Sequence, residues 1–175
     1  EGVMSVDRRV LCARSAYFRA MFESGMQEAR SGVVDLPPDV GVAAFRCLVD
    51  YLHTDLIDPL RAAGHPGTTP ENLSPDALRE CTLVCMEVVK MADVYQLPRL
   101  HQLAELFVHT HGLSVSGVLQ LLVRAHALGA HGIEEACFQF VSEHAKELKQ
   151  RCAEEIINIV HTKPSVAAKL LMRSL

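Results

Sequence analysis

The sequence lacks the features that would place this chain in a membrane or on nucleic acid. Its apolar runs are broken by charges well short of the roughly 20 residues that span a bilayer. The start lacks the basic, apolar and small-residue order of a signal peptide. No basic run is present, and the formal net charge of −4 disfavours a general binder of nucleic acid. We therefore expect no membrane and no nucleic acid among its partners.

Motifs for catalysis and for metal binding are also missing. The chain has no G-x-S-x-G, no Gly-rich phosphate loop and no H-E-x-x-H. Cys81 and Cys85 stand at i, i+4 on one predicted helix face rather than in a C-x-x-C pair, and His109 and His111 have no matching second pair. We expect no enzyme, no metal site and no cofactor.

Disulfides are not expected either, although the six cysteines form an even number. Hydrophobic residues make up 49% of the 175 residues and charged residues 22%, so the chain can build a packed interior without covalent bridges. Most of the cysteines fall at apolar positions of helical period, where a free thiol acts as a small hydrophobic group. This predicts buried free thiols and a reducing compartment, the cytoplasm or the nucleus.

The stretch from Arg8 to Glu28 organises the chain. It predicts two short helices, the second capped by Ser15 and ended by Gly25. A wide apolar stripe at helical period marks this second helix. The stripe consists of Tyr17, Phe18, Met21 and Phe22. A short connection, Met26-Gln27-Glu28, then leads to a predicted strand at Val33–Leu36.

The rest of the chain is predicted to be helical apart from one loop. After Pro37-Pro38, Asp39 is the expected N-cap of the next helix. Residues 59–75 are rich in Pro and Gly, which predicts a loop, either disordered or a contact surface. Ser74-Pro75 and Pro98 each open a further helix, the second closed by Gly112. Apolar periodicity then predicts four helices, one of them ended near Gly129, with short connections that suggest antiparallel packing.

Three segments in order resemble a BTB/POZ domain, over roughly Val6 to Phe107. The run V-L-C-A-R-S-A-Y-F-R-A-M-F is similar to the second and third helices of that family. Val34-Asp35-Leu36 and the apolar helix after it, which contains Phe45, Leu48, Tyr51 and Leu52, resemble the last strand and the following helix. The segment M-A-D-V-Y-Q-L with Leu100 is similar to the family's A-D-x-Y-x-L-x-x-L junction.

The resemblance implies a fold, and the sequence departs from the family's pattern at its beginning. We expect an α+β, predominantly helical fold: a BTB/POZ domain over 1–111 with an insertion at about 58–75, then an antiparallel helical BACK-like region over 112–175. The family's first helix and opening strands would precede Glu1, so we expect the chain to begin inside a longer protein. Asp7-Arg8 stands where the family usually has His-Arg. Because the missing layer usually builds the family's homodimer, dimerisation is an open question.

The resemblance also implies a function: a non-enzymatic substrate adaptor that docks the N-terminal domain of cullin-3 in a RING ubiquitin ligase, while another module holds the protein substrate. The family's hydrophobic-x-Glu element corresponds to Met26-Gln27-Glu28. The implied partner-binding residues are Phe22, Met26, Gln27, Glu28, His53, Tyr95, Val118 and Leu122.

Each of these residues has an alternative interpretation. The Met-x-Glu pattern can be an ordinary polar loop, Tyr95 a structural tyrosine, and Val118 and Leu122 plain core. His53 stands where relatives carry a tyrosine. At the level of the whole protein, the alternative is a BTB scaffold for self-association, in transcriptional or channel assembly, that never binds a cullin.

Overall fold

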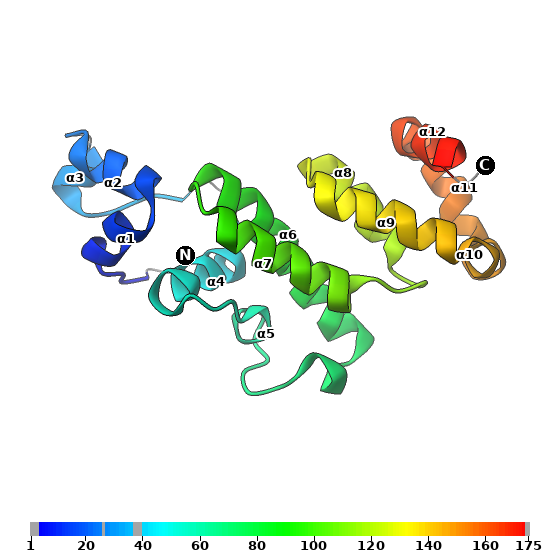
Figure 1. Cartoon of the computed structure of the whole chain (residues 1–175), viewed down its shortest axis with the longest axis horizontal. Coiled ribbons are helices and arrows are strands. Elements are labelled where there is room, and N and C mark those ends of the chain that lie inside the picture. Colours follow the sequence, from blue (N-terminus) through cyan, green and yellow to red (C-terminus); the bar gives the residue numbers. More distant parts are fainter. Residues whose placement is uncertain (1–3, 26, 37–39, 174–175) are drawn as a thin grey trace. The chain divides into compact units, whose positions relative to one another are not determined.

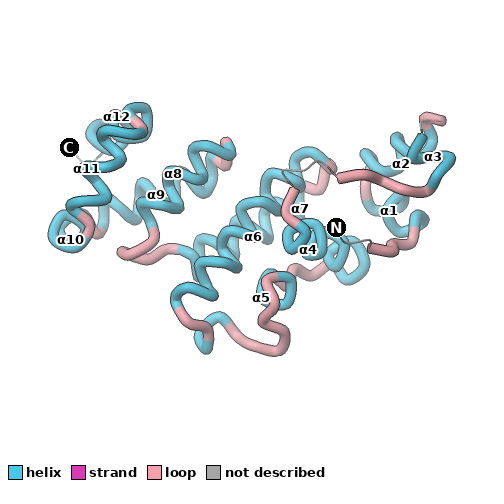
Figure 2. Tube along the Cα trace, turned by 180° about the vertical axis from the view of Figure 1, so that it is seen from behind, coloured by secondary structure: helices cyan, strands magenta, loops and turns pink. Residues whose placement is uncertain are grey.

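The computed structural model describes residues 4–25, 27–36 and 40–173. Within these ranges every regular element is a helix (Figures 1 and 2). The chain divides between Ala104 and Glu105 into two compact units, which are described separately as the N-terminal unit and the C-terminal unit.

The N-terminal unit consists of short helices around one long one. Its elements are α1 (Arg8–Arg14), α2 (Ala16–Glu23), α3 (Gln27–Ser31), α4 (Val42–Thr54), α5 (Pro59–Ala62), the 3₁₀ turn η1 (Pro70–Asn72), α6 (Pro75–Val94) and the start of α7 (Pro98–Phe107). Two expected starts are confirmed. The Ser15 hydroxyl accepts a hydrogen bond from the Phe18 amide, and Ser74 caps α6 with Pro75 in its first turn.

The core of this unit lies where α4 and α5 pack on α6. Leu48 and Leu52 of α4 and Met86 and Val88 of α6 are almost completely buried, as is Leu100 of α7. Burial of a side chain of this size contributes about 1.5–3 kcal/mol. The apolar face of α6 is therefore the support on which the shorter helices pack.

The strand predicted at Val33–Leu36 was wrong. These residues follow α3 without regular structure, and the Val33 side chain is 60% exposed. A strand persists only when its backbone groups pair with a neighbouring strand. Within the described ranges no strand is present to pair with it, so a sequence typical of a strand stays irregular. The β part of the α+β expectation therefore fails for these residues.

The start of α4 has no side-chain cap among the described residues. Its N-cap is Gly41, which provides no side-chain hydrogen bond, and the expected cap Asp39 lies outside the described residues, as do Pro37 and Pro38. The carboxylate of Glu87 on α6 occupies the space where a Cβ at position 41 would lie. A side chain at position 41 would require this carboxylate to move aside. As placed, the carboxylate lies near the N-terminal end of α4, where the helix dipole favours negative charge.

The loop expected over residues 58–75 was also partly wrong. Asp58 accepts a hydrogen bond from the Arg61 amide, 2.9 Å, and with Pro59 in the first turn it starts α5. Leu60 and Ala62 of this helix are each only 6% exposed. The high Pro and Gly content suggested a loop, but the Asp-Pro start and the buried apolar side chains fix a turn of helix against α4 and α6.

The C-terminal unit is a set of helices joined by short connections. It contains the end of α7, the π-helical turn η2 (Val108–Gly112), α8 (Val118–Leu128), α9 (His131–Glu143), α10 (Ala145–Arg151), α11 (Ala153–Thr162) and α12 (Pro164–Arg173). Gly129 ends α8 with a left-handed φ of 70°, as expected from its position. The sequence analysis did not separate α10 from its neighbours. Its only buried residue is Leu148, and one buried position gives no readable period.

All six cysteines are free thiols, and every one except the half-buried Cys12 is buried, as predicted. Burial raises the pKa of Cys47 and of Cys137 to about 12, so both stay protonated. The helices of the described ranges include none that is long and apolar enough to cross a membrane.

Candidate protein-interaction surface

The start of α2 is tied to the end of α6 by one buried hydroxyl. Ser15, 1% exposed, accepts from the Phe18 amide at 3.3 Å and donates to the carbonyl oxygen of Tyr95 at 2.8 Å. Tyr95 follows the last turn of α6, and the next residue, Gln96, has a left-handed φ of 56°. The hydroxyl therefore fixes a tight turn and a helix start at the same point.

Aromatic rings pack around this point. The Phe18 ring stacks on the Tyr95 ring, with centroids 4.9 Å apart, and Tyr17 meets Tyr95 edge to face at 5.1 Å. Phe45 of α4 adds a further edge contact at 6.4 Å. Tyr95 is only 6% exposed, and burial raises the pKa of its phenol, whereas Tyr17 is 38% exposed. Tyr95 is thus the buried centre of the cluster and Tyr17 its outer ring.

Arg8 fixes α3 to the end of α2. Its guanidinium donates to the carbonyl oxygens of Phe22, 2.9 Å, and Ala29, 3.3 Å, and lies over the Phe22 ring at 4.6 Å. A cation at the C-terminal end of a helix satisfies unpaired carbonyls and complements the dipole. Glu28 lies in the first turn of α3 and is half-buried. Arg8 therefore holds the short helix through its backbone, while the Gln27 side chain is exposed and the Glu28 side chain is half-buried.

A second arginine joins α1 to the end of α4. Arg14 makes an ion pair with Asp55, and its guanidinium lies 5.8 Å from the centroid of the Tyr51 ring. The hydrogen bond from Arg14 lowers the pKa of Asp55. His53, two residues before Asp55, is exposed, and its Nδ1 lies 2.9 Å from the Val49 carbonyl oxygen of its own helix.

The structure separates the predicted partner-binding residues into two groups. Gln27 and His53 are exposed and Glu28 is half-buried, so these three can meet a partner. Phe22 and Tyr95 are buried, at 5% and 6%, and support the surface from below. Met26 lies outside the described residues.

Val118 and Leu122 lie in the other unit and are completely buried. They form the core of α8, where they pack with α9. Their role as partner contacts stays a prediction.

The sequence analysis missed Arg8, Arg14 and Tyr17. Tyr17 had been assigned to the apolar stripe of α2, because its spacing is that of a buried position. The two arginines carry no local signal: each acts on a residue far away in the chain, at separations of 14 to 41 positions. Asp7 of the departing Asp7-Arg8 pair does have a local role, because it caps α1.

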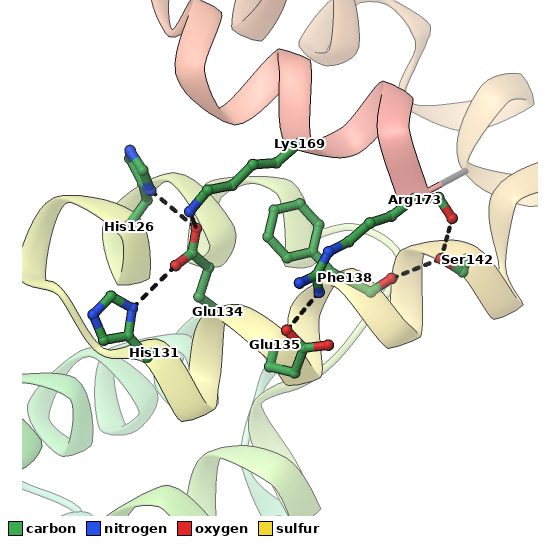
Figure 3. Close-up of polar contacts among 8 residues, drawn as sticks. All are labelled: His126, His131, Glu134, Glu135, Phe138, Ser142, Lys169 and Arg173. Atoms are coloured by element: carbon green, nitrogen blue, oxygen red, sulfur yellow. Dashed lines mark hydrogen bonds and ion pairs between the residues drawn. The ribbon is translucent and has the colours of Figure 1, made fainter. Parts of the chain in front are cut away.

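The C-terminal unit contains a second polar cluster, in which hydrogen bonds and ion pairs join side chains of different helices (Figure 3). Glu134 of α9 is only 5% exposed, and its Oε1 lies 2.9 Å from Nδ1 of His126 and 2.7 Å from Nζ of Lys169. His131 adds a longer contact to Oε2 at 3.5 Å. Burial acts to raise the pKa of Glu134, but the hydrogen bonds from Lys169 and His126 bring the pKa below its usual value.

The link continues from His126 to Ser165, whose Oγ lies 3.2 Å from Nε2. A Ser–His–carboxylate order is also found in hydrolases. Here, however, Lys169 already neutralises the carboxylate oxygen that would have to stabilise an imidazolium, and Ser165 stands exposed in the first turn of α12. The three residues come from α12, α8 and α9, and their effect is to hold these helices together.

Arg173 makes a second tie between α12 and α9. Its guanidinium pairs with Glu135 at 2.5 Å and lies over the Phe138 ring at 4.8 Å. Among the described residues, no group of three or more His, Cys, Asp or Glu side chains could hold a metal ion. The C-terminal cluster is thus a structural tie, and the surface around α2 and α3 is the candidate for interaction.

Comparison with known proteins identifies a domain in the N-terminal part of the chain. Residues 2–66 match the family model of the BTB/POZ domain, so this part of the chain carries that domain, which is a protein-interaction module. The match covers α1 to α5 and therefore includes Tyr17 and the contacts of Arg8, whereas Tyr95 lies outside it.

Several curated relatives combine a BTB domain with another module. The chain is 29% identical over 152 residues to BTB/POZ and MATH domain-containing protein 6 of Arabidopsis thaliana, covering 83% of this chain and 34% of that protein. It is 28% identical over 154 residues to the human Kelch repeat and BTB domain-containing protein 4, covering 88% and 24%. With rat Kelch-like protein 21 it shares 27% over 144 residues, covering 81% and 20%. The chain thus spans between a fifth and about a third of the length of these three relatives.

Proposed function

We propose that this chain is the adaptor part of a cullin-3 RING ubiquitin ligase, with a BTB/POZ domain over 1–111 and a BACK-like region over 112–175. Its BTB domain would bind the N-terminal domain of the cullin, and another module of the longer protein would bind the substrate. The MATH and Kelch modules named in the relatives show that BTB domains of this kind occur beside a second module.

The observation that carries the proposal is the way α3 is presented. Arg8 donates hydrogen bonds to the backbone carbonyls of Phe22 and Ala29, and these bonds tie α3 to the end of α2. Gln27 and Glu28 can therefore contact a partner without weakening the fold. A carboxylate in such a place can accept a charge-assisted hydrogen bond, which adds orientation as well as affinity.

The chain would act by proximity rather than by chemistry. Binding the cullin and the substrate at once makes the transfer of ubiquitin effectively intramolecular, and the gain depends on how far the linkers can reach. No side chain of this unit has to donate or accept a proton during the reaction. This agrees with the role of Glu28 as an orienting group.

One observation favours a second candidate, a BTB scaffold that binds another BTB chain instead of a cullin. Residues 33–36 have the composition of a strand but pair with no strand in the described ranges, and Val33 is largely exposed. Pairing with a strand of another chain would satisfy this segment by β-augmentation.

Titration calorimetry against the N-terminal domain of cullin-3 distinguishes the two functions. The adaptor requires binding by the wild-type chain and at least a tenfold loss in a Met26→Ala, Glu28→Ala double variant. The matched control is Glu23→Ala, which removes an exposed carboxylate from the end of α2. A folded wild-type chain that does not bind, but sediments as a dimer, would replace the adaptor with the scaffold.

A further inference from the structure

Helix α11 of the C-terminal unit leaves an apolar stripe uncovered (Figure 1). Ala153, Ile157 and Val160 stand at i, i+4 and i+7, so they share one side of the helix, and all three are exposed. Ile157 is 58% exposed and Val160 48%, whereas Ile159 is only 7% exposed and belongs to the core. The helix therefore has a second apolar side, which its own unit does not cover.

Charged side chains border this stripe, acidic at its start and basic at its end. Glu154 lies in the first turn of α11, His161 lies in the last turn, and Lys163 follows the helix as its C-cap. Among the described residues none of these three makes an ion pair, whereas Arg151 of the preceding helix pairs with Glu147 at 2.8 Å. The charges at the two ends of α11 are therefore available to a second molecule.

The pattern of apolar and charged residues on α11 is complementary to itself. When two copies of the helix lie antiparallel about a two-fold axis, the acidic start of each meets the basic end of the other. If Ile157 of each copy packs on Val160 of the other, Glu154 comes opposite Lys163 and beside His161. A parallel pairing would instead place like charges side by side, so the charges select the antiparallel direction.

We propose that α11 is a self-association surface and that its occupant is α11 of a second copy of the chain, in the antiparallel direction. The contact is made by one helix of each copy and is small beside the interfaces of obligate dimers, so the dimer is weak and forms as the protein concentration rises. The inference goes beyond the proposed adaptor function. Such a dimer would carry two copies of the surface around α2 and α3, and two linked surfaces can raise the avidity for a partner without any new contact.

Analytical ultracentrifugation of the whole chain over a range of concentrations tests the contact. The wild type is expected to show a reversible monomer–dimer equilibrium. Ile157→Arg places a charge in the middle of the apolar stripe and should weaken this equilibrium by about tenfold or more. The matched control is Leu106→Arg, the same change at a side chain that is 62% exposed on α7, and it should associate like the wild type. Thermal unfolding shows whether each variant keeps its fold.

Charge reversal tests the direction and register of the pairing. Glu154→Lys and Lys163→Glu each place like charges opposite one another in the dimer and should weaken it by about threefold or more. When the two variants are mixed in equal amounts, both pairs of the mixed dimer carry opposite charges, so the mixture should associate about as strongly as the wild type. Mixing cannot repair a folding defect of either variant, so recovery reports the pairing itself.

Several outcomes would overturn the inference. They are a wild-type chain that stays monomeric over the whole range, a dimer that Ile157→Arg leaves unchanged, and charge variants whose mixture does not recover or that never lose association. If Val33→Arg dissociates the dimer and Ile157→Arg does not, the copies pair through residues 33–36, as in the scaffold, and α11 has no part in the contact. Binding to cullin-3 is measured separately, so each of these results leaves the test of the adaptor function unaffected.

Discussion

The two units each hold one short helix, α2 in the first and α12 in the second, with different side-chain contacts. In the N-terminal unit, α2 is attached through stacked rings and a neutral hydroxyl, because Phe18 and Ser15 both meet Tyr95. In the C-terminal unit, α12 is attached through charges, because Lys169 pairs with the buried Glu134. Aromatic packing depends little on salt and pH, whereas an ion pair depends on both. The attachment of α2 should therefore change little with salt and pH, whereas the attachment of α12 should depend on both.

The largest effect is expected from removing a ring in the N-terminal unit. Phe18→Ala deletes a side chain that is 1% exposed and stacked on Tyr95, so the free energy of unfolding should fall by about 3–5 kcal/mol. Urea denaturation combined with hydrogen exchange measures this. Exchange should rise in α1, α2 and the end of α6. Equal loss of protection in α8 and α9 would contradict the separate attachment of the two units.

The corresponding change in the C-terminal unit is Lys169→Met. It removes the ammonium while keeping much of the side-chain length, and leaves the buried Glu134 with histidine partners only. We expect a loss of about 1.5–3 kcal/mol, the range for a hydrogen bond to a charged group, with faster hydrogen exchange in α12. Lys146→Met, at an exposed position in α10, is the matched control and should be close to neutral. A neutral Lys169→Met would show that His126 alone satisfies the carboxylate.

Ser15→Ala is expected to cost less, about 1–2 kcal/mol. It removes the cap of α2 and the hydrogen bond to the Tyr95 carbonyl at the same time. Thermal unfolding measures the loss, and Ser15→Thr should recover part of it because a hydroxyl is retained. An alanine variant as stable as the wild type would mean that the aromatic stack alone positions α2.

The smallest expected effect is a loss of stability of α12 as the pH is lowered. Hydrogen bonds from Lys169 and His126 hold the pKa of Glu134 below its usual value in the folded state. The stability that this gives is present above the unfolded-state pKa of about 4.3 and is lost as pH falls through the lower folded-state pKa. In hydrogen exchange between pH 6 and pH 3, α12 should lose protection in the wild type with a steeper pH dependence than in Glu134→Gln. Equal slopes would contradict this role of the carboxylate.

The sequence predicted most helices but not what joins them. Ser15 and the Ser74-Pro75 pair were correct because a cap acts within its own turn of helix. The strand at Val33–Leu36 failed because a strand needs a partner, which local composition cannot supply.

The contacts of the candidate surface were hidden for a related reason. Tyr17 and Tyr95 have the same side chain, and only the packing of α2 against the end of α6 decides which of them is covered. The sequence likewise offered no reason to single out Glu134, since Lys169 lies 35 positions away in the chain. Spacing shows which face of a helix is apolar, but it does not show which polar side chains another helix will reach.

The carboxylate of Glu87 beside Gly41 has a consequence for natural variation of this protein. A side chain at position 41 would require Glu87 to turn to another rotamer, whereas a shorter residue at position 87 would leave that volume open. The two positions should therefore change together among homologous chains: glycine at 41 where position 87 is glutamate, and an ordinary capping residue at 41 where it is small. Such a pattern would show that the residue at the start of α4 has varied together with a residue on α6.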